Sequence, residues 1–155
     1  MKINSQICTT KEQSERLLAL GLKKETADMF YTNASLPFEK DKFHLECKEF
    51  AQLEKEVNYQ ICPFTFIPAW SLHRLMSLCP ETLPYEGDEL RDMYSPDEYE
   101  LQISQTGCQY LADNARYGGE RLNYFYEDGN LYDALISCIE WVIKEGKFNQ
   151  DFLVK

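Results

Sequence analysis

The two histidines are the first residues at which this chain could do acid–base or metal chemistry. His44-Leu-Glu46 has the H-x-E spacing of zinc deaminases, in which the histidine binds zinc and the glutamate transfers protons. That site also needs a P-C-x-x-C motif. The nearest fragments here, Cys62-Pro63 and Cys79-Pro80, have one cysteine each and the reverse order. We therefore reject a deaminase site.

For the other residues that could act in catalysis, no local sequence motif identifies one as a nucleophile or a base. A nucleophilic cysteine needs a neighbouring base, and any of the six thiols could meet His44 or His73 only through the fold. We expect His73 on a helix, roughly opposite its apolar stripe, where it is either exposed to solvent or has its hydrogen bonds satisfied rather than acting as a base. Gly118-Gly119 lacks the spacing of a phosphate-binding loop. The sequence thus predicts no catalytic residue, no cofactor and no metal site, and it favours a protein that is not an enzyme.

The most unusual feature of the sequence is an acidic segment: residues 81–100 contain eight carboxylates and a single basic residue, Arg91. They lack the alternating oxygen ligands of an EF-hand loop. A catalytic carboxylate pair depends on a separation that spacing alone does not give. A mimic of DNA phosphates and a plain solvated loop both remain open, the solvated loop being the simplest. Interleaved tyrosines and Met93 favour a protein-contact surface, or else core anchors. The candidate interaction surface consists of Glu86, Asp88, Glu89, Asp92, Tyr94 and Asp97.

Composition narrows the possible partners. The chain has 155 residues, a formal net charge of −10 and 44% hydrophobic residues, which suits one folded domain over residues 1–155. Nonspecific binding to nucleic acid or to an anionic membrane is disfavoured, because phosphates require Lys and Arg. No stretch reaches the ~20 apolar residues of a membrane span. Without a secretory signal, we expect a cytoplasmic protein with reduced thiols.

The elements that must position these residues are clearest at the C-terminal end. Asn130 is a predicted N-cap, and Gly146 is predicted to end the helix that follows. Its polar residues, at spacings of 4, 3 and 4, form one narrow stripe, so most of the circumference should be covered. We expect Trp141 in the core, where truncation to alanine would cost about 3–5 kcal/mol. The stripe consists of Asp133, Ser137, Glu140 and Lys144.

Further helices are expected in the first half of the chain. A capping box at Thr10–Gln13 predicts a helix that ends at Gly21. A second short helix is predicted over Lys24–Phe30, although a DNA-binding helix-turn-helix is disfavoured by its charge. Pro68 suits the first turn of a long helix that ends at Cys79. Residues 32–62 fit both a strand and a helix, and periodicity does not decide between them.

Strands are predicted between the acidic segment and the C-terminal helix. Tyr99 to Ile103 alternates apolar and polar residues, and residues 108–113 and 121–126 follow after turns. The expected fold is α+β: a three-stranded or four-stranded antiparallel meander, covered on one face by the C-terminal helix and a second long helix, with a small N-terminal helical pair.

Three segments together resemble a family of small uncharacterised proteins from gut anaerobic bacteria, their phages and mobile elements. These segments are SERLLALGLKKETADM over residues 14–29, PAWSLHRLM over 68–76 and NLYDALISCIEWVIKEGKF over 130–148. The resemblance implies a bacterial or phage setting and carries no catalytic residue, cofactor or partner. We therefore expect a non-enzymatic accessory or protein-interaction protein. The alternatives are a small hydrolase that uses a carboxylate pair or Cys/His, and an acidic DNA-mimic inhibitor.

Overall fold

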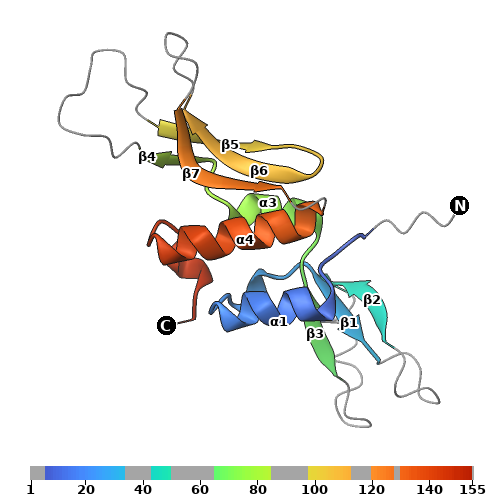
Figure 1. Ribbon diagram of the computed structural model, residues 1–155. Coiled ribbons are helices and arrows are strands. Elements are labelled where there is room, and N and C mark those ends of the chain that lie inside the picture. Colours follow the sequence, from blue (N-terminus) through green and yellow to red (C-terminus); the bar gives the residue numbers. More distant parts are fainter. Residues whose placement is uncertain are drawn as a thin grey trace, which may run out of the picture. The chain divides into compact units, whose positions relative to one another are not determined.

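The structure is a computed structural model that describes residues 6–33, 43–49, 65–84, 98–112, 120–127 and 130–154 (Figure 1). Only the backbone is described for Ala112 and for residues 120–127. The chain divides into two compact units. Unit 1 comprises Met1–Arg74 and Asp151–Lys155, and unit 2 comprises Leu75–Gln150. The α+β class is confirmed, and a single domain over residues 1–155 stays a prediction. Within the described residues, no helix combines the length and apolar character required to cross a bilayer.

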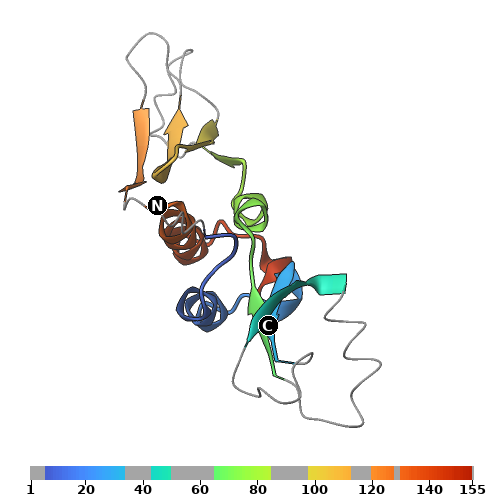
Figure 2. The ribbon, with the colours of Figure 1, turned by 90° about the vertical axis from the view of Figure 1, so that its right-hand side faces the viewer.

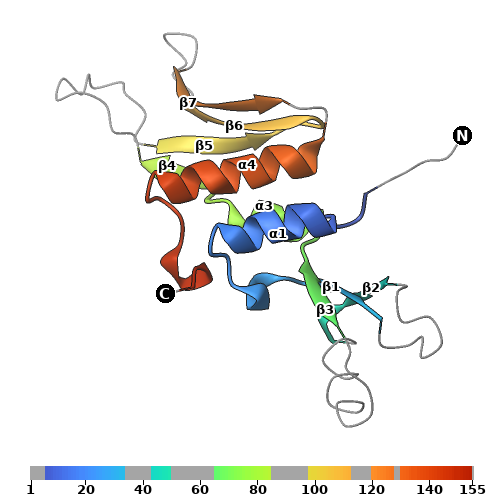
Figure 3. The same ribbon diagram turned by 60° about the horizontal axis from the view of Figure 1, so that its bottom comes forward.

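Unit 1 combines one helix with a small sheet. Helix α1 (Lys11–Ala19) packs against strand β3 (Phe66–Ala69) (Figure 3). The sheet has the order β2-β1-β3 and is antiparallel, with β1 at Met29–Thr32 and β2 at His44–Cys47. The strand alternative for the ambiguous stretch is therefore correct at β2, while residues 34–42 and 50–64 lie outside the described residues.

The predicted capping box of α1 is confirmed. The Thr10 hydroxyl oxygen accepts from the Gln13 backbone N–H at 3.2 Å, and the Gln13 side chain accepts from the Thr10 N–H at 2.9 Å. Two of the backbone donors left free by the first turn are thereby satisfied. After α1 ends, Gly21 has a φ of +88°, which glycine adopts without a side-chain penalty. The helix thus ends where the glycine predicts.

Two helix predictions in unit 1 are wrong in their extent. Lys24–Phe30 is not a helix: only Lys24–Thr26 forms a 3₁₀ turn, and Met29 and Phe30 belong to β1. Likewise Pro68 does not start a helix but lies in β3, opposite Phe30. Because β3 is at the sheet edge, the missing proline N–H is tolerated there. Helix α3 is correspondingly short, spanning Leu72–Leu78. In both places strand pairing overrides local helical preference.

Trp70 is the buried centre of unit 1, with none of its surface exposed. Its backbone N–H donates to the Thr9 hydroxyl oxygen at 3.0 Å, and its carbonyl accepts from the Thr9 N–H at 2.9 Å. Its indole N–H donates to the Thr26 hydroxyl oxygen at 3.0 Å. Every tryptophan donor is therefore satisfied inside the core, as a buried indole requires. The sequence placed Trp70 in a helix and assigned it no role.

The segment after Trp70 is fixed by a carboxylate. Asp28 accepts from the Ser71 backbone N–H at 2.8 Å and from the Ser71 hydroxyl at 2.5 Å. The same hydroxyl oxygen accepts from the Arg74 N–H at 3.1 Å, so Ser71 caps α3. The Arg74 guanidinium in turn donates to the Thr26 carbonyl at 2.7 Å. These bonds attach the start of α3 to the turn that precedes β1.

The last residues of the chain also belong to unit 1. The Lys23 N–H donates to the Phe152 carbonyl at 2.9 Å, and the Val154 N–H donates to the Gly21 carbonyl at 2.8 Å. The Arg74 guanidinium lies 5.7 Å from the centre of the Phe152 ring, within the range of a cation–π contact. Unit 1 is therefore assembled from both ends of the chain, with unit 2 inserted between them.

Unit 2 contains a four-stranded sheet in which the strands follow the chain order β4-β5-β6-β7, each pair antiparallel. Three of these strands lie where the alternation predicts them. Helix α4 (Leu131–Lys144) packs on β6 and β7, and Figures 1 and 2 show the sheet on one side of this helix. That a second long helix also covers this face of the sheet stays a prediction. The strands are β4 (Thr82–Pro84), β5 (Glu98–Ile103), β6 (Gly107–Ala112) and β7 (Glu120–Glu127).

Helix α4 has the predicted ends and the predicted narrow polar stripe. The Asn130 side-chain oxygen accepts from the Tyr132 N–H at 3.0 Å, and Gly146 follows the helix with a φ of +69°. Within the stripe, Lys144 donates to Glu140 at 2.8 Å. The buried side chains occupy more than one side of the helix, as the pattern requires. They are Tyr132, Ala134, Leu135, Ile136, Cys138, Ile139 and Val142.

Trp141 corrects one expectation about this helix, because it is only half-buried. Its ring lies 6.0 Å from that of Tyr110, centre to centre, with the two planes tilted by 38°. Such an aromatic pair stabilises the contact between α4 and β6 while leaving part of the indole exposed. Of the two tryptophans, the fully buried one is Trp70.

We therefore predict that Trp70→Ala lowers the free energy of unfolding by about 3–5 kcal/mol, and that Trp141→Ala lowers it by less. Urea denaturation followed by far-ultraviolet circular dichroism measures both. Trp70→Phe is the matched variant: it keeps an aromatic ring but removes the donor to Thr26, which should cost about 1 kcal/mol. A loss below about 1 kcal/mol for Trp70→Ala would contradict the assignment of Trp70 to the core.

Removal of residues 151–155 should destabilise unit 1 selectively, because it deletes the bonds to Gly21 and Lys23. Hydrogen exchange with mass spectrometry should show faster exchange in α1 and β1, and unchanged exchange in α4 and β6. Val154→Ser is the control, since that side chain is 66% exposed and the backbone N–H remains. Equal acceleration in both units would show that they unfold together.

Candidate functional site

The predicted interaction surface lies outside the described residues. This holds for Glu86, Asp88, Glu89, Asp92, Tyr94 and Asp97. The structure does describe residues at both ends of the acidic segment. Glu81, Glu98 and Glu100 are exposed, whereas Tyr99 is buried, with 6% of its surface exposed. Of the two interpretations of Tyr99, a contact surface or a core anchor, the core anchor is the correct one.

The pairing of β4 with β5 explains this division. Leu83 lies opposite Tyr99, and both are buried. Because side chains alternate between the two faces of a strand, their neighbours point the other way. Thr82 lies opposite Glu100 and is exposed with it. Glu81, Glu98 and Glu100, the exposed carboxylates at the two described ends of the acidic segment, are named here the acidic rim.

The two ends of the acidic segment meet at one position of the sheet. Pro84, the last residue of β4, pairs with Glu98, the first residue of β5. On the same face, the Gln109 side-chain amide donates to the Gln102 side-chain oxygen at 3.2 Å across β5 and β6. The described residues on either side of 85–97 are therefore adjacent in an ordered sheet.

A second arrangement with chemical potential lies on β2 in unit 1. His44 and Glu46, two residues apart, lie on the same side of the strand, and His44 Nε2 is 2.7 Å from Glu46 Oε1. Both side chains are partly exposed, at 31% and 18%. A carboxylate that orients an imidazole is the base half of a catalytic triad. The H-x-E spacing thus produces a direct contact between the two side chains.

The second histidine, His73, has no carboxylate two residues away in the sequence, and the structure exposes it to solvent. His73 is exposed on α3, as predicted. Within the described residues, no group of three or more His, Cys, Asp or Glu side chains is placed to hold a metal ion. Among the described residues, the His44–Glu46 pair is therefore not part of such a group.

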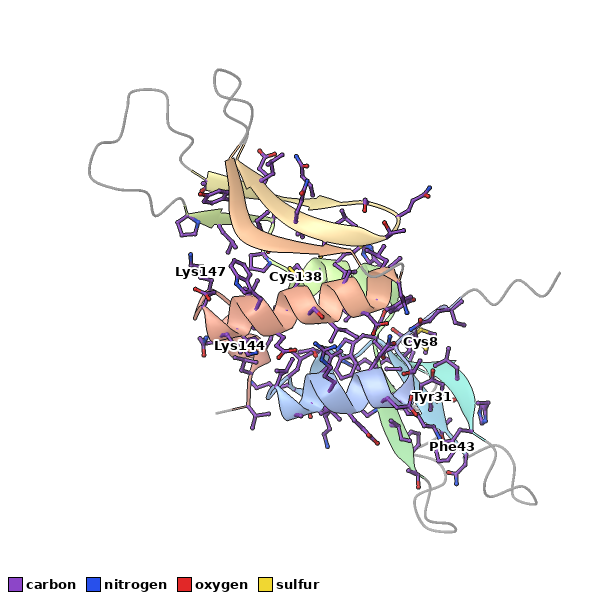
Figure 4. All side chains as sticks on the ribbon, viewed as in Figure 1. Cys8, Tyr31, Phe43, Cys138, Lys144 and Lys147 are labelled. Carbon is purple, nitrogen blue, oxygen red and sulfur yellow. The ribbon has the colours of Figure 1, made fainter. Side chains whose placement is uncertain are left out.

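The described cysteines are free thiols, four of them buried. The Cys8 thiol lies 3.3 Å from the Tyr31 hydroxyl, which also donates to the Thr9 carbonyl at 2.9 Å (Figure 4). Burial raises the pKa of Cys8; the bond to Tyr31 opposes this, and the charge of Asp28 adds to it. A neutral, buried thiol is a poor nucleophile, so Cys8 is a packing residue of unit 1.

Unit 2 contains a thiol cluster, which we define as Cys79, Cys108 and Cys138 around Tyr110. All four residues are at most 4% exposed. Figure 4 shows Cys138 on the side of α4 toward the sheet. The Cys108 thiol donates to the Ala134 carbonyl at 3.5 Å, and the Tyr110 hydroxyl donates to the Pro80 carbonyl at 2.7 Å. The sequence placed Cys79 and Cys138 on apolar faces, but only the fold shows that they meet.

Contacts within the thiol cluster and burial together raise the pKa of Cys138. The bond with Cys108 lowers the pKa of Cys138, but the contact with Cys79 and burial raise it, and the net shift is upward. Burial is the main cause that raises the pKa of Tyr110. Neutral thiols in an apolar core behave as small hydrophobic side chains. The thiol cluster therefore contributes packing to unit 2.

The raised pKa of Cys138 predicts a pH-dependent stability. An unfolded thiol ionises at about 8.5. The contribution of Cys138 is therefore complete below that pH and is lost as the pH rises toward the folded pKa. The stability difference between wild type and Cys138→Ala should shrink above pH 8.5, by at most about 1.4 kcal/mol per pH unit. Urea titrations between pH 7 and 10 measure it.

Ile139→Val is the matched control for this titration, because Ile139 is fully buried on the same helix and carries no ionisable group. Its effect on stability should not change with pH. A Cys138→Ala difference that is constant up to pH 10 would mean that the folded thiol ionises as readily as the unfolded one.

The chain was compared with protein-family models, curated proteins and solved structures. No protein-family model, curated protein or solved structure matches the chain.

Proposed function

We propose that this protein is a non-enzymatic accessory protein of a bacterium, or of its phage or mobile element, and that it acts in the cytoplasm by binding another protein. The acidic segment and the acidic rim together form the contact surface, which includes Glu86, Asp88, Glu89, Asp92, Tyr94 and Asp97. The observation that carries the proposal is the pairing of Pro84 with Glu98, which anchors an acidic segment with interleaved aromatic residues at both ends.

Charge identifies the kind of partner. The acidic rim is exposed on an ordered sheet, and the segment between its members adds Glu86, Asp88, Glu89, Asp92 and Asp97 against Arg91. The whole chain has a net charge of −10, which repels nucleic acid and anionic lipid and attracts basic protein surfaces. Tyrosine and methionine between the carboxylates provide the apolar contact area that charge alone does not. The partner is therefore a protein with a basic surface.

A tagged chain expressed in its native host should co-purify with such a partner. Conversion of Glu86, Asp88, Glu89 and Asp92 to Gln or Asn should reduce recovery of the partner at least tenfold. The matched control removes four carboxylates from exposed positions elsewhere, at Glu15, Glu25, Glu49 and Glu145. This control changes the net charge by the same amount but leaves the acidic segment intact, so it should retain binding. Full retention by the first variant would remove the acidic segment from the contact.

The salt dependence of the same complex distinguishes a DNA mimic from an ordinary contact. A mimic binds its basic target through many carboxylates, so binding should weaken steeply as salt shortens the screening length from about 10 Å at 0.1 M. A contact based on tyrosine and methionine should lose less affinity. A target that is itself a DNA-binding protein, released by competing DNA, would support the mimic.

A small hydrolase is the second candidate, and the observation that favours it is the contact between His44 and Glu46. The interaction proposal predicts no turnover of p-nitrophenyl esters or glycosides above the uncatalysed rate. Turnover that His44→Gln abolishes, and that Glu46→Gln reduces without a change in folding, would replace the interaction proposal with a hydrolase. His73→Gln is the control, because that histidine is exposed on α3.

A further inference from the structure

We draw no further inference here: the strongest candidate, the thiol cluster of Cys79, Cys108 and Cys138 in the core of unit 2, carries nothing because apolar packing accounts for its burial and no observation on the described residues points to a ligand.

Discussion

The burial of Trp70 is the constraint on which unit 1 depends. A buried indole contributes several kcal/mol of apolar burial, but its N–H loses about 1–3 kcal/mol if no acceptor replaces water. Thr26 provides that acceptor, and Thr9 pairs with the Trp70 backbone. Both threonines are themselves buried. Segments far apart in the sequence must therefore come together before the tryptophan can be buried without cost.

Asp28 likewise satisfies polar groups at the start of α3. A carboxylate that accepts two bonds from Ser71 fixes the direction in which the chain leaves β3, and charge-assisted bonds of this kind are among the stronger ones in proteins. The C-terminal residues complete unit 1 through backbone bonds to Gly21 and Lys23. Unit 1 is thus closed by residues that are synthesised after all of unit 2.

Unit 2 is stabilised differently, by the packing of the apolar surface of α4 against a sheet that covers part of it. Its core contains three thiols and a phenol, and burial contributes to the raised pKa of both Tyr110 and Cys138. The outer face of the same sheet carries Glu98 and Glu100, because strand alternation directs Tyr99 inward and these two neighbours outward. The buried Tyr99 and the exposed Glu98 and Glu100 therefore lie on two faces of one strand.

The sequence by itself determined the features that local chemistry controls. Thr10 and Asn130 cap their helices as predicted, Gly21 and Gly146 lie just beyond the ends of their helices, and β5 alternates as its pattern indicates. Each of these depends on contacts within a few residues. The α+β class follows from the same local signals.

Only the tertiary structure decided the features that depend on distant partners. Met29, Phe30 and Pro68 are strand residues because β1 pairs with β3, a gain that no local helical preference matches. The contact of Cys138 with Cys79 and Cys108 joins three separate elements. The full burial of Trp70 and the partial exposure of Trp141 have the same origin: burial depends on what the fold places around a side chain, and the residue type does not specify it.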